Sequence, residues 1–200
     1  MRTTRMRLFG LICLALATLP QVALAHAPLT PDTPMGNAFF HSALTWDHAA
    51  MAALMGMWAA FIGRPSIWVM PIVAMAAILI GGALPMMDVS LPGADVAIPM
   101  ASVVFGLCVL FAVQPPIGIT GAMIGVGGLY LGQIHVTGMG PMDWPLMGVI
   151  GFLGGTLAAM AVGTAAGALT YIGRGEFFVR LGGAGMTALG VSFLAGAMMS

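Results

Sequence analysis

Residues 117–136 read IGITGAMIGVGGLYLGQIHV and contain no Asp, Glu, Lys or Arg. A helix needs about 20 mostly apolar residues to cross the hydrocarbon core of a bilayer. Backbone polar groups in lipid must be satisfied within the segment, and an α-helix satisfies them along its whole length. This segment therefore predicts a transmembrane helix.

The composition of the whole chain agrees with a membrane protein. Of its 200 residues, 60% are hydrophobic and 6% are charged, with six Lys+Arg and six Asp+Glu. A soluble domain carries about 25% charged residues, a disordered chain combines high charge with low hydrophobicity, and a nucleic-acid-binding surface is strongly basic. No phosphate-binding loop or nucleophile motif is present. We therefore expect a protein that contacts the lipid bilayer, binds no nucleic acid and is not an enzyme.

Five further apolar runs resemble residues 117–136. Turn-forming Gly and Pro residues separate the runs, as at residues 63–65 (Gly-Arg-Pro) and 114–116 (Gln-Pro-Pro). The six predicted transmembrane helices cover residues 39–62, 67–84, 96–113, 117–136, 144–170 and 177–198. The expected fold is an all-α polytopic membrane protein, a bundle of six transmembrane helices that fills residues 39–200.

Glycines four residues apart recur in the fourth and fifth predicted helices. Small residues at this spacing let helix backbones approach closely in lipid. The pairs are Gly121/Gly125, Gly128/Gly132, Gly151/Gly155 and Gly163/Gly167. They predict tight crossings among the fourth and fifth helices, and they concern packing rather than function.

Residues 1–25 have the form of a cleaved signal peptide. Arg2, Arg5 and Arg7 precede an apolar core at residues 8–19 that is too short to span a bilayer, and residues 23–25 (Ala-Leu-Ala) form a small-x-small cleavage site. The alternative is a retained first transmembrane helix. Cleavage leaves residues 26–38 as a periplasmic segment before the first helix.

The remaining charges predict the orientation in the membrane. With the mature N-terminus outside, Arg64, Arg174 and Arg180 all fall on the cytoplasmic side, as the positive-inside rule requires. The outward loops carry acidic residues and no Arg. We therefore expect a multi-pass protein of a bacterial inner membrane, with both mature termini in the periplasm.

Three polar residues lie inside the first predicted helix, namely His41, Asp47 and His48. A charged side chain at mid-membrane costs about 2.5–3.5 kcal/mol on insertion scales, so ionisable groups there are candidates for function. On one continuous helix His41 and His48 lie within about 20° of each other and roughly 10 Å apart along the axis. Asp47 points about 100° away from His48, where it meets another helix or orients an imidazole.

The predicted topology brings all four histidines toward the periplasmic face. His135 lies at the outer end of the fourth helix, and His26 becomes the first mature residue. Imidazole and carboxylate ligands suit Ni, Zn or Cu(II). The sequence thus predicts a metal or ion-pathway site that contains His41, Asp47 and His48, with His135 and His26 as further ligands. The alternative is that the imidazoles only hydrogen-bond between helices, and for His135 both interpretations stay open.

The stretch from residue 41 to residue 48 (His-Ser-Ala-Leu-Thr-Trp-Asp-His), after a signal peptide and a mature His, resembles the HupE/UreJ family. The family pattern is His-Pro-x-x-Gly-x-Asp-His, so His41, Asp47 and His48 match it while Ser42 and Thr45 replace its Pro and Gly. The resemblance continues at residues 56–60, 91–95 and 151–152. It implies a hydrogenase- or urease-associated membrane protein that is regarded as a nickel permease.

The second half of the chain departs from the family pattern. The His-rich segment at the end of the fourth helix appears as residues 131–136 (Leu-Gly-Gln-Ile-His-Val), with His135 alone retained. Met160 stands where the family usually carries a His in its fifth helix. Gln133 and Met160 are therefore expected to be weaker contributors to the site.

Taken together, the residues and the resemblance predict a secondary permease for a divalent transition metal, nickel first, which supplies a metalloenzyme. The transported ion is Ni²⁺, with Co²⁺ or copper as alternatives; copper is kept because Met replaces His in the fifth helix and the chain holds 19 Met. A second alternative is a non-transporting accessory subunit of a larger membrane complex. The expected partner is a metalloenzyme-maturation protein or that membrane complex.

Overall fold

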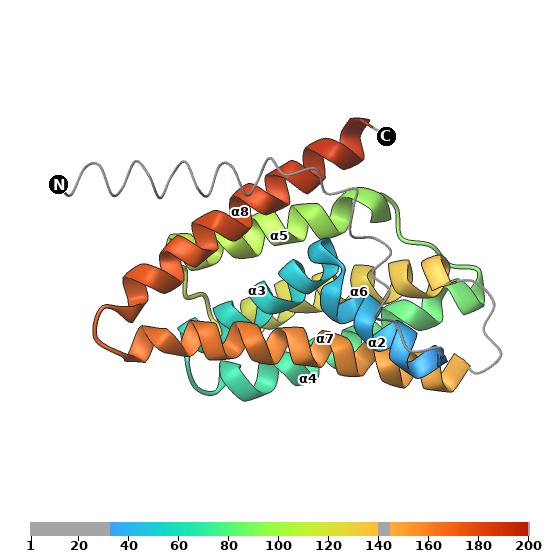
Figure 1. Cartoon of the computed structure of the whole chain (residues 1–200), viewed down its shortest axis with the longest axis horizontal. Coiled ribbons are helices and arrows are strands. Elements are labelled where there is room, and N and C mark those ends of the chain that lie inside the picture. The colour runs from blue at the N-terminus through green and yellow to red at the C-terminus, as the bar shows by residue number, and fades with distance from the viewer. Residues whose placement is uncertain (1–32, 140–144, 200) are drawn as a thin grey trace.

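The computed structural model describes residues 33–139 and 145–199, and every regular element in these ranges is helical. The helices are α2 (Pro34–Leu44), α3 (Trp46–Ile62), α4 (Ser66–Ala83), α5 (Ala94–Leu110), α6 (Ile117–Met139), α7 (Pro145–Ala168) and α8 (Gly175–Met199). Short 3-10 helices extend α4 (η2, Leu84–Met87) and α7 (η3, Leu169–Tyr171). Figure 1 shows an elongated bundle in which α3 lies between α7 and the α5–α8 pair. The predicted signal peptide and His26 lie outside the described residues.

Four helical segments are long and apolar enough to cross a membrane. They are Ser66–Met87, Ile117–Gly138, Leu146–Tyr171 and Gly175–Met199, whereas Ala94–Leu110 is apolar but shorter. Together with the helical content, they confirm the prediction of an all-helical, multi-pass membrane protein. Crossings by residues 39–62 and 96–113, and hence the total of six, stay predictions.

The first predicted helix, residues 39–62, is wrong in its start and in its continuity. The helical structure begins at Pro34, because Thr33 Oγ1 accepts a hydrogen bond from the Gly36 N–H at 3.2 Å and Pro34 suits the first turn. Thr45 then has an extended backbone (φ −70°, ψ 114°), so α2 ends before it and α3 begins after it. Residues 34–38, which were expected in the periplasmic segment, therefore belong to α2.

The predicted glycine pairs do mark close helix contacts, but not between α6 and α7. A Cβ on Gly132 would meet the backbone of Ile78 in α4, and one on Gly163 would meet the backbone of Ala53 in α3. The pair at 151 and 155 packs in the same way on α2. The expectation that the two glycine-rich helices cross each other was wrong, because spacing shows which face is small and leaves the partner helix open.

The same contacts give the relative directions of the helices. Gly151, Gly155, Gly163 and Gly167 of α7 meet successively later residues of α2 and α3, so α7 runs parallel to this pair. In the same way α6 runs parallel to α4. By contrast, α8 runs antiparallel to α5, because Gly183 meets the last turn of α5 and Gly190 meets an earlier one.

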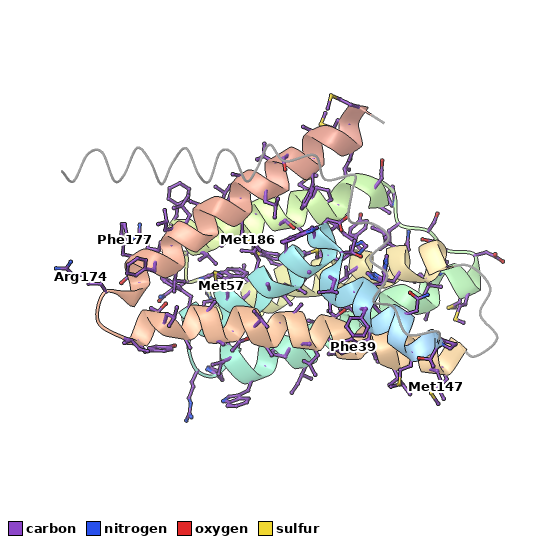
Figure 2. All side chains as sticks on the ribbon, viewed as in Figure 1. Phe39, Met57, Met147, Arg174, Phe177 and Met186 are labelled. Carbon is purple, nitrogen blue, oxygen red and sulfur yellow. The ribbon has the colours of Figure 1, made fainter. Side chains whose placement is uncertain are left out.

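Every arginine in the described residues lies at one end of this bundle. Arg64 follows α3 and Arg174 follows α7, and the Tyr171 hydroxyl joins these two ends by donating to a carbonyl in the last turn of α3 at 2.7 Å. Arg180 Nε donates to the last carbonyl of α5 at 2.8 Å. Figure 2 shows Arg174 projecting from this end and Met147 near the opposite end. We call the first of these the arginine end.

Candidate metal site

Three histidines from three helices meet inside the bundle. The ring centroids of His41 on α2 and His48 on α3 are 5.6 Å apart, and those of His48 and His135 on α6 are 4.4 Å apart. One ring nitrogen from each lies within 4.8 Å of the other two. His48 and His135 are only 8% and 2% exposed, whereas His41 is exposed. This histidine triad is therefore open on the His41 side and closed on the other two.

The break between α2 and α3 is what brings the first two histidines together. Phe39 packs against Gly155 of α7, and Ala53 packs against Gly163. Phe39 and Ala53 are fourteen positions apart in sequence, but their partners on α7 are only eight positions apart. Because of the break at Thr45, the segment from Phe39 to Ala53 is therefore shorter along the helix axis than a continuous helix would be. The difference is six residues, or about 9 Å at a rise of 1.5 Å per residue. The break removes most of the axial separation that a continuous helix would impose on these two imidazoles.

His135 is held in one orientation by its own helix and by α7. Its Nδ1 lies 2.8 Å from the Leu131 carbonyl, and since a carbonyl only accepts, Nδ1 carries the proton of the neutral ring. Nε2 is then left with a free lone pair, and it is buried without a hydrogen-bond partner in the part of the chain that the structure describes. The ring of Phe152 stacks on the imidazole with centroids 3.8 Å apart and planes 28° apart. His135 therefore presents an unprotonated nitrogen in a fixed position.

Asp47 borders the triad and is not one of the three converging groups. Its Oδ1 accepts the backbone N–H of His48 at 2.8 Å, which places a negative charge in the first turn of α3. The same oxygen lies 3.8 Å from His48 Nδ1, which has no hydrogen-bond partner among the described residues. Asp47 thus fixes the start of α3 and sets a negative charge beside a buried imidazole.

Ser42, which the sequence does not single out as a site residue, anchors the helix that carries His41. Ser42 is 1% exposed, and its hydroxyl donates to the Phe152 carbonyl of α7 at 3.0 Å. This bond holds the turn that carries His41 against α7. The signal was present in the sequence, because Ser42 is a small polar residue in an apolar helix directly after a histidine.

Gln133 and Met160, which the sequence predicts as weaker contributors to the metal site, make other contacts in the structure. Gln133 Oε1 accepts the Leu91 N–H at 2.7 Å and its Nε2 donates to the Leu91 carbonyl at 3.4 Å, so this amide ties the loop before α5 to α6. Met160 is buried where the backbone of α7 meets Gly56 of α3, two turns beyond Phe152. Neither belongs to the group of converging ring nitrogens.

The donor set fits a transition-metal ion. Imidazole suits nickel, copper, zinc and iron, and three protein ligands leave further positions open for water or for another group. Bonds of about 2.0–2.1 Å place ligand nitrogens roughly 3.0–3.4 Å apart. The triad nitrogens, which lie within 4.8 Å of one another, reach that spacing by small movements of the rings.

The chain is similar to known membrane proteins along almost its whole length. A family model described as HupE / UreJ protein matches residues 14–193. The chain belongs to the HupE/UreJ family. Within this family, Protein HupE of Rhizobium leguminosarum bv. viciae is 27% identical over 183 residues, which cover 92% of this chain and 95% of the relative. No solved structure matches the chain.

Proposed function

We propose that this HupE/UreJ protein is an inner-membrane secondary permease that carries a divalent transition metal, nickel first, from the periplasm to the cytoplasm for a metalloenzyme. The supporting observation is a pair of buried ring nitrogens, His48 Nδ1 and His135 Nε2, that have no hydrogen-bond partner among residues 33–139 and 145–199. A buried polar atom without a partner is costly. Metal binding removes that cost, and the exposed His41 gives the ion access to the pair.

The direction of transport follows from the proposed topology. Six crossings in alternating directions produce the observed relations: α7 parallel to α2 and α3, α6 parallel to α4, and α8 antiparallel to α5. The arginine end is then cytoplasmic, residues 1–25 are a cleaved signal peptide, and both mature termini are periplasmic. In this arrangement His26 and His41 capture the ion, and Asp47 offsets its charge beside His48.

The membrane potential is a sufficient source of energy for uptake. It supplies about 2.3 kcal/mol per elementary charge per 100 mV, hence about 4.6 kcal/mol for a divalent cation. The ion still has to leave its hydration shell, and three imidazoles with a neighbouring carboxylate replace part of that shell.

Uptake of radiolabelled nickel in cells tests this proposal. The proteins compared are wild type, His48→Ala, Asp47→Asn and the control Asp95→Asn, which changes an exposed carboxylate at the start of α5. We expect uptake to fall by about tenfold or more for His48→Ala, by less for Asp47→Asn, and to be unchanged for Asp95→Asn. Equal uptake by all four above an empty-vector control contradicts the role of the triad.

Copper is the second candidate, because two fully buried thioethers follow His48 on α3. Met51 and Met55 come about one and two turns after it, and thioethers select Cu(I). Nickel, cobalt and copper uptake measured side by side separates the candidates, and copper-only uptake rejects nickel. No uptake of any metal, with co-purification of a stoichiometric partner, supports a non-transporting accessory subunit.

A further inference from the structure

Thr156 of α7 has a buried hydroxyl with no hydrogen-bond partner in the described part of the chain. The residue is 1% exposed. A threonine inside a helix usually donates to the carbonyl four residues earlier, as Thr120 and Thr187 do here. For Thr156 that carbonyl belongs to Phe152, and it accepts the Ser42 hydroxyl instead. The Ser42 hydroxyl therefore occupies the carbonyl to which the Thr156 hydroxyl would usually donate.

The position of Thr156 follows from its neighbours on the same face of α7. Phe152, Thr156 and Met160 are spaced by four residues, so they follow one another along one side of the helix. Phe152 stacks on His135, and the backbone at Met160 meets Gly56 of α3. Thr156 therefore lies on the buried face of α7 between a residue that contacts α6 and one that meets α3, one turn from the triad toward the arginine end.

Several other buried polar side chains in the described residues are already engaged. Ser102 and Thr120 donate to carbonyls of their own helices or the preceding turn, and Gln133 is bonded to the loop before α5. Thr170, in the 3-10 helix η3 that follows α7 at the arginine end, has the other hydroxyl in the described residues that is buried without a partner. Two unpaired hydroxyls, one on α7 and one on η3, thus lie at successive depths beyond the triad.

From these observations, and given the proposed transport function, we infer that the Thr156 hydroxyl is the first inward ligand of the ion after it leaves the histidine triad. Its oxygen lone pairs are not used by any described residue, so they are available to a cation. A neutral oxygen binds a transition metal more weakly than imidazole does. Weak binding is what a transit position requires, since conduction needs sites that an ion enters and also leaves.

Replacing Thr156 by valine, which keeps the shape and removes the oxygen, tests the inference. We expect nickel uptake to fall about tenfold, while nickel binding by the solubilised protein stays within about twofold of wild type. Thermal stability in detergent should be equal or higher, because an unsatisfied buried hydroxyl is removed. Thr156→Ser, which restores the oxygen, should recover uptake.

Thr120→Val is the matched control, because it removes a fully buried hydroxyl that has its carbonyl partner. We expect it to lower thermal stability and to leave uptake per folded molecule unchanged. Wild-type uptake by Thr156→Val overturns the inference, and so does a loss of nickel binding as large as the loss of uptake, which would assign Thr156 to the triad itself. Failure of the wild-type protein to take up or bind any metal instead overturns the proposed function, and the inference with it.

Discussion

Ser42 and Phe152, 110 residues apart in sequence, form a contact that positions two members of the histidine triad, His41 and His135. The Ser42 hydroxyl donates to the Phe152 carbonyl at 3.0 Å, and the Phe152 ring stacks on His135 with centroids 3.8 Å apart. The backbone of one residue thus positions the helix that carries His41, while its side chain positions His135. Metal affinity is therefore expected to depend on residues that never touch the metal.

Replacing Ser42 by alanine tests this dependence. The variant loses the bond to the Phe39 carbonyl of its own helix at 3.2 Å and the buried bond to Phe152. The buried bond is worth about 0.5–1.5 kcal/mol, which corresponds to about a two- to tenfold lower nickel affinity if the bond only positions the site. Isothermal titration of the solubilised protein measures it. Ser102→Ala is the control, because that hydroxyl bonds within its own helix, to the Ile98 carbonyl. Equal nickel affinity for Ser42→Ala and wild type would show that α2 is held by other contacts.

The protonation pattern of His135 can be observed directly. Because Nδ1 donates to the Leu131 carbonyl, the metal-free ring should be the neutral tautomer with its proton on Nδ1. Two-dimensional NMR of ¹⁵N-histidine-labelled protein in detergent distinguishes the tautomers, and His135→Ala assigns the signal. Nickel should then perturb Nε2 first. A proton found on Nε2 would contradict the orientation described for this ligand.

Gln133 is expected to contribute to stability and not to metal binding. Gln133→Leu removes both hydrogen bonds to Leu91 and leaves its N–H without that acceptor, which costs about 1–3 kcal/mol. Thermal unfolding in detergent should show the loss, with nickel affinity unchanged. The control is Gln114→Leu, at an exposed position before α6. If nickel affinity falls for Gln133→Leu alone, the amide has a role as a ligand that its contacts do not indicate.

Glycines at the helix crossings should tolerate even a methyl group poorly. At Gly163 a Cβ would overlap the Ala53 backbone of α3, whereas at Gly185 of α8 nothing lies within 4 Å. Gly163→Ala should therefore destabilise the protein by about 1–3 kcal/mol through overpacking, and Gly185→Ala should be neutral or stabilising. Unfolding in detergent compares the two. Equal stabilities would mean that α3 and α7 separate more easily than their packing implies.

Apolar length and composition predict an all-helical membrane protein, and His41 and His48, which stand out in the first apolar run, converge with His135 in the structure. Their role as metal ligands stays a prediction. Apolar length predicts helices, because every backbone group in lipid must be paired within the chain. The residues His41 and His48 stand out because apolar helices carry few ionisable groups. Their convergence with His135 was expected only as a shared side of the membrane, since the pattern does not say which helices become neighbours.

The break at Thr45 could not be predicted from local sequence. No Gly or Pro stands at the break, and residues 39–62 otherwise form one apolar run. Two contacts accompany the interruption: the tertiary bond of Ser42 with α7, and the local bond of the Asp47 carboxylate to the His48 N–H at the start of α3. The tertiary contact overrides helix propensity, which is only a weak prior. A continuous helix would have kept the two imidazoles about 10 Å apart along its axis.

The position of Phe152 in the chain also has a consequence for biosynthesis. All three imidazoles have been synthesised once residue 135 leaves the ribosome, but the Phe152 carbonyl that anchors the helix of His41 and the Phe152 ring that stacks on His135 come 17 residues later. A nascent chain that ends after α6 therefore has the three histidines without these two contacts. Under the proposed function, we expect the protein to capture metal in an ordered site only after α7 has been inserted.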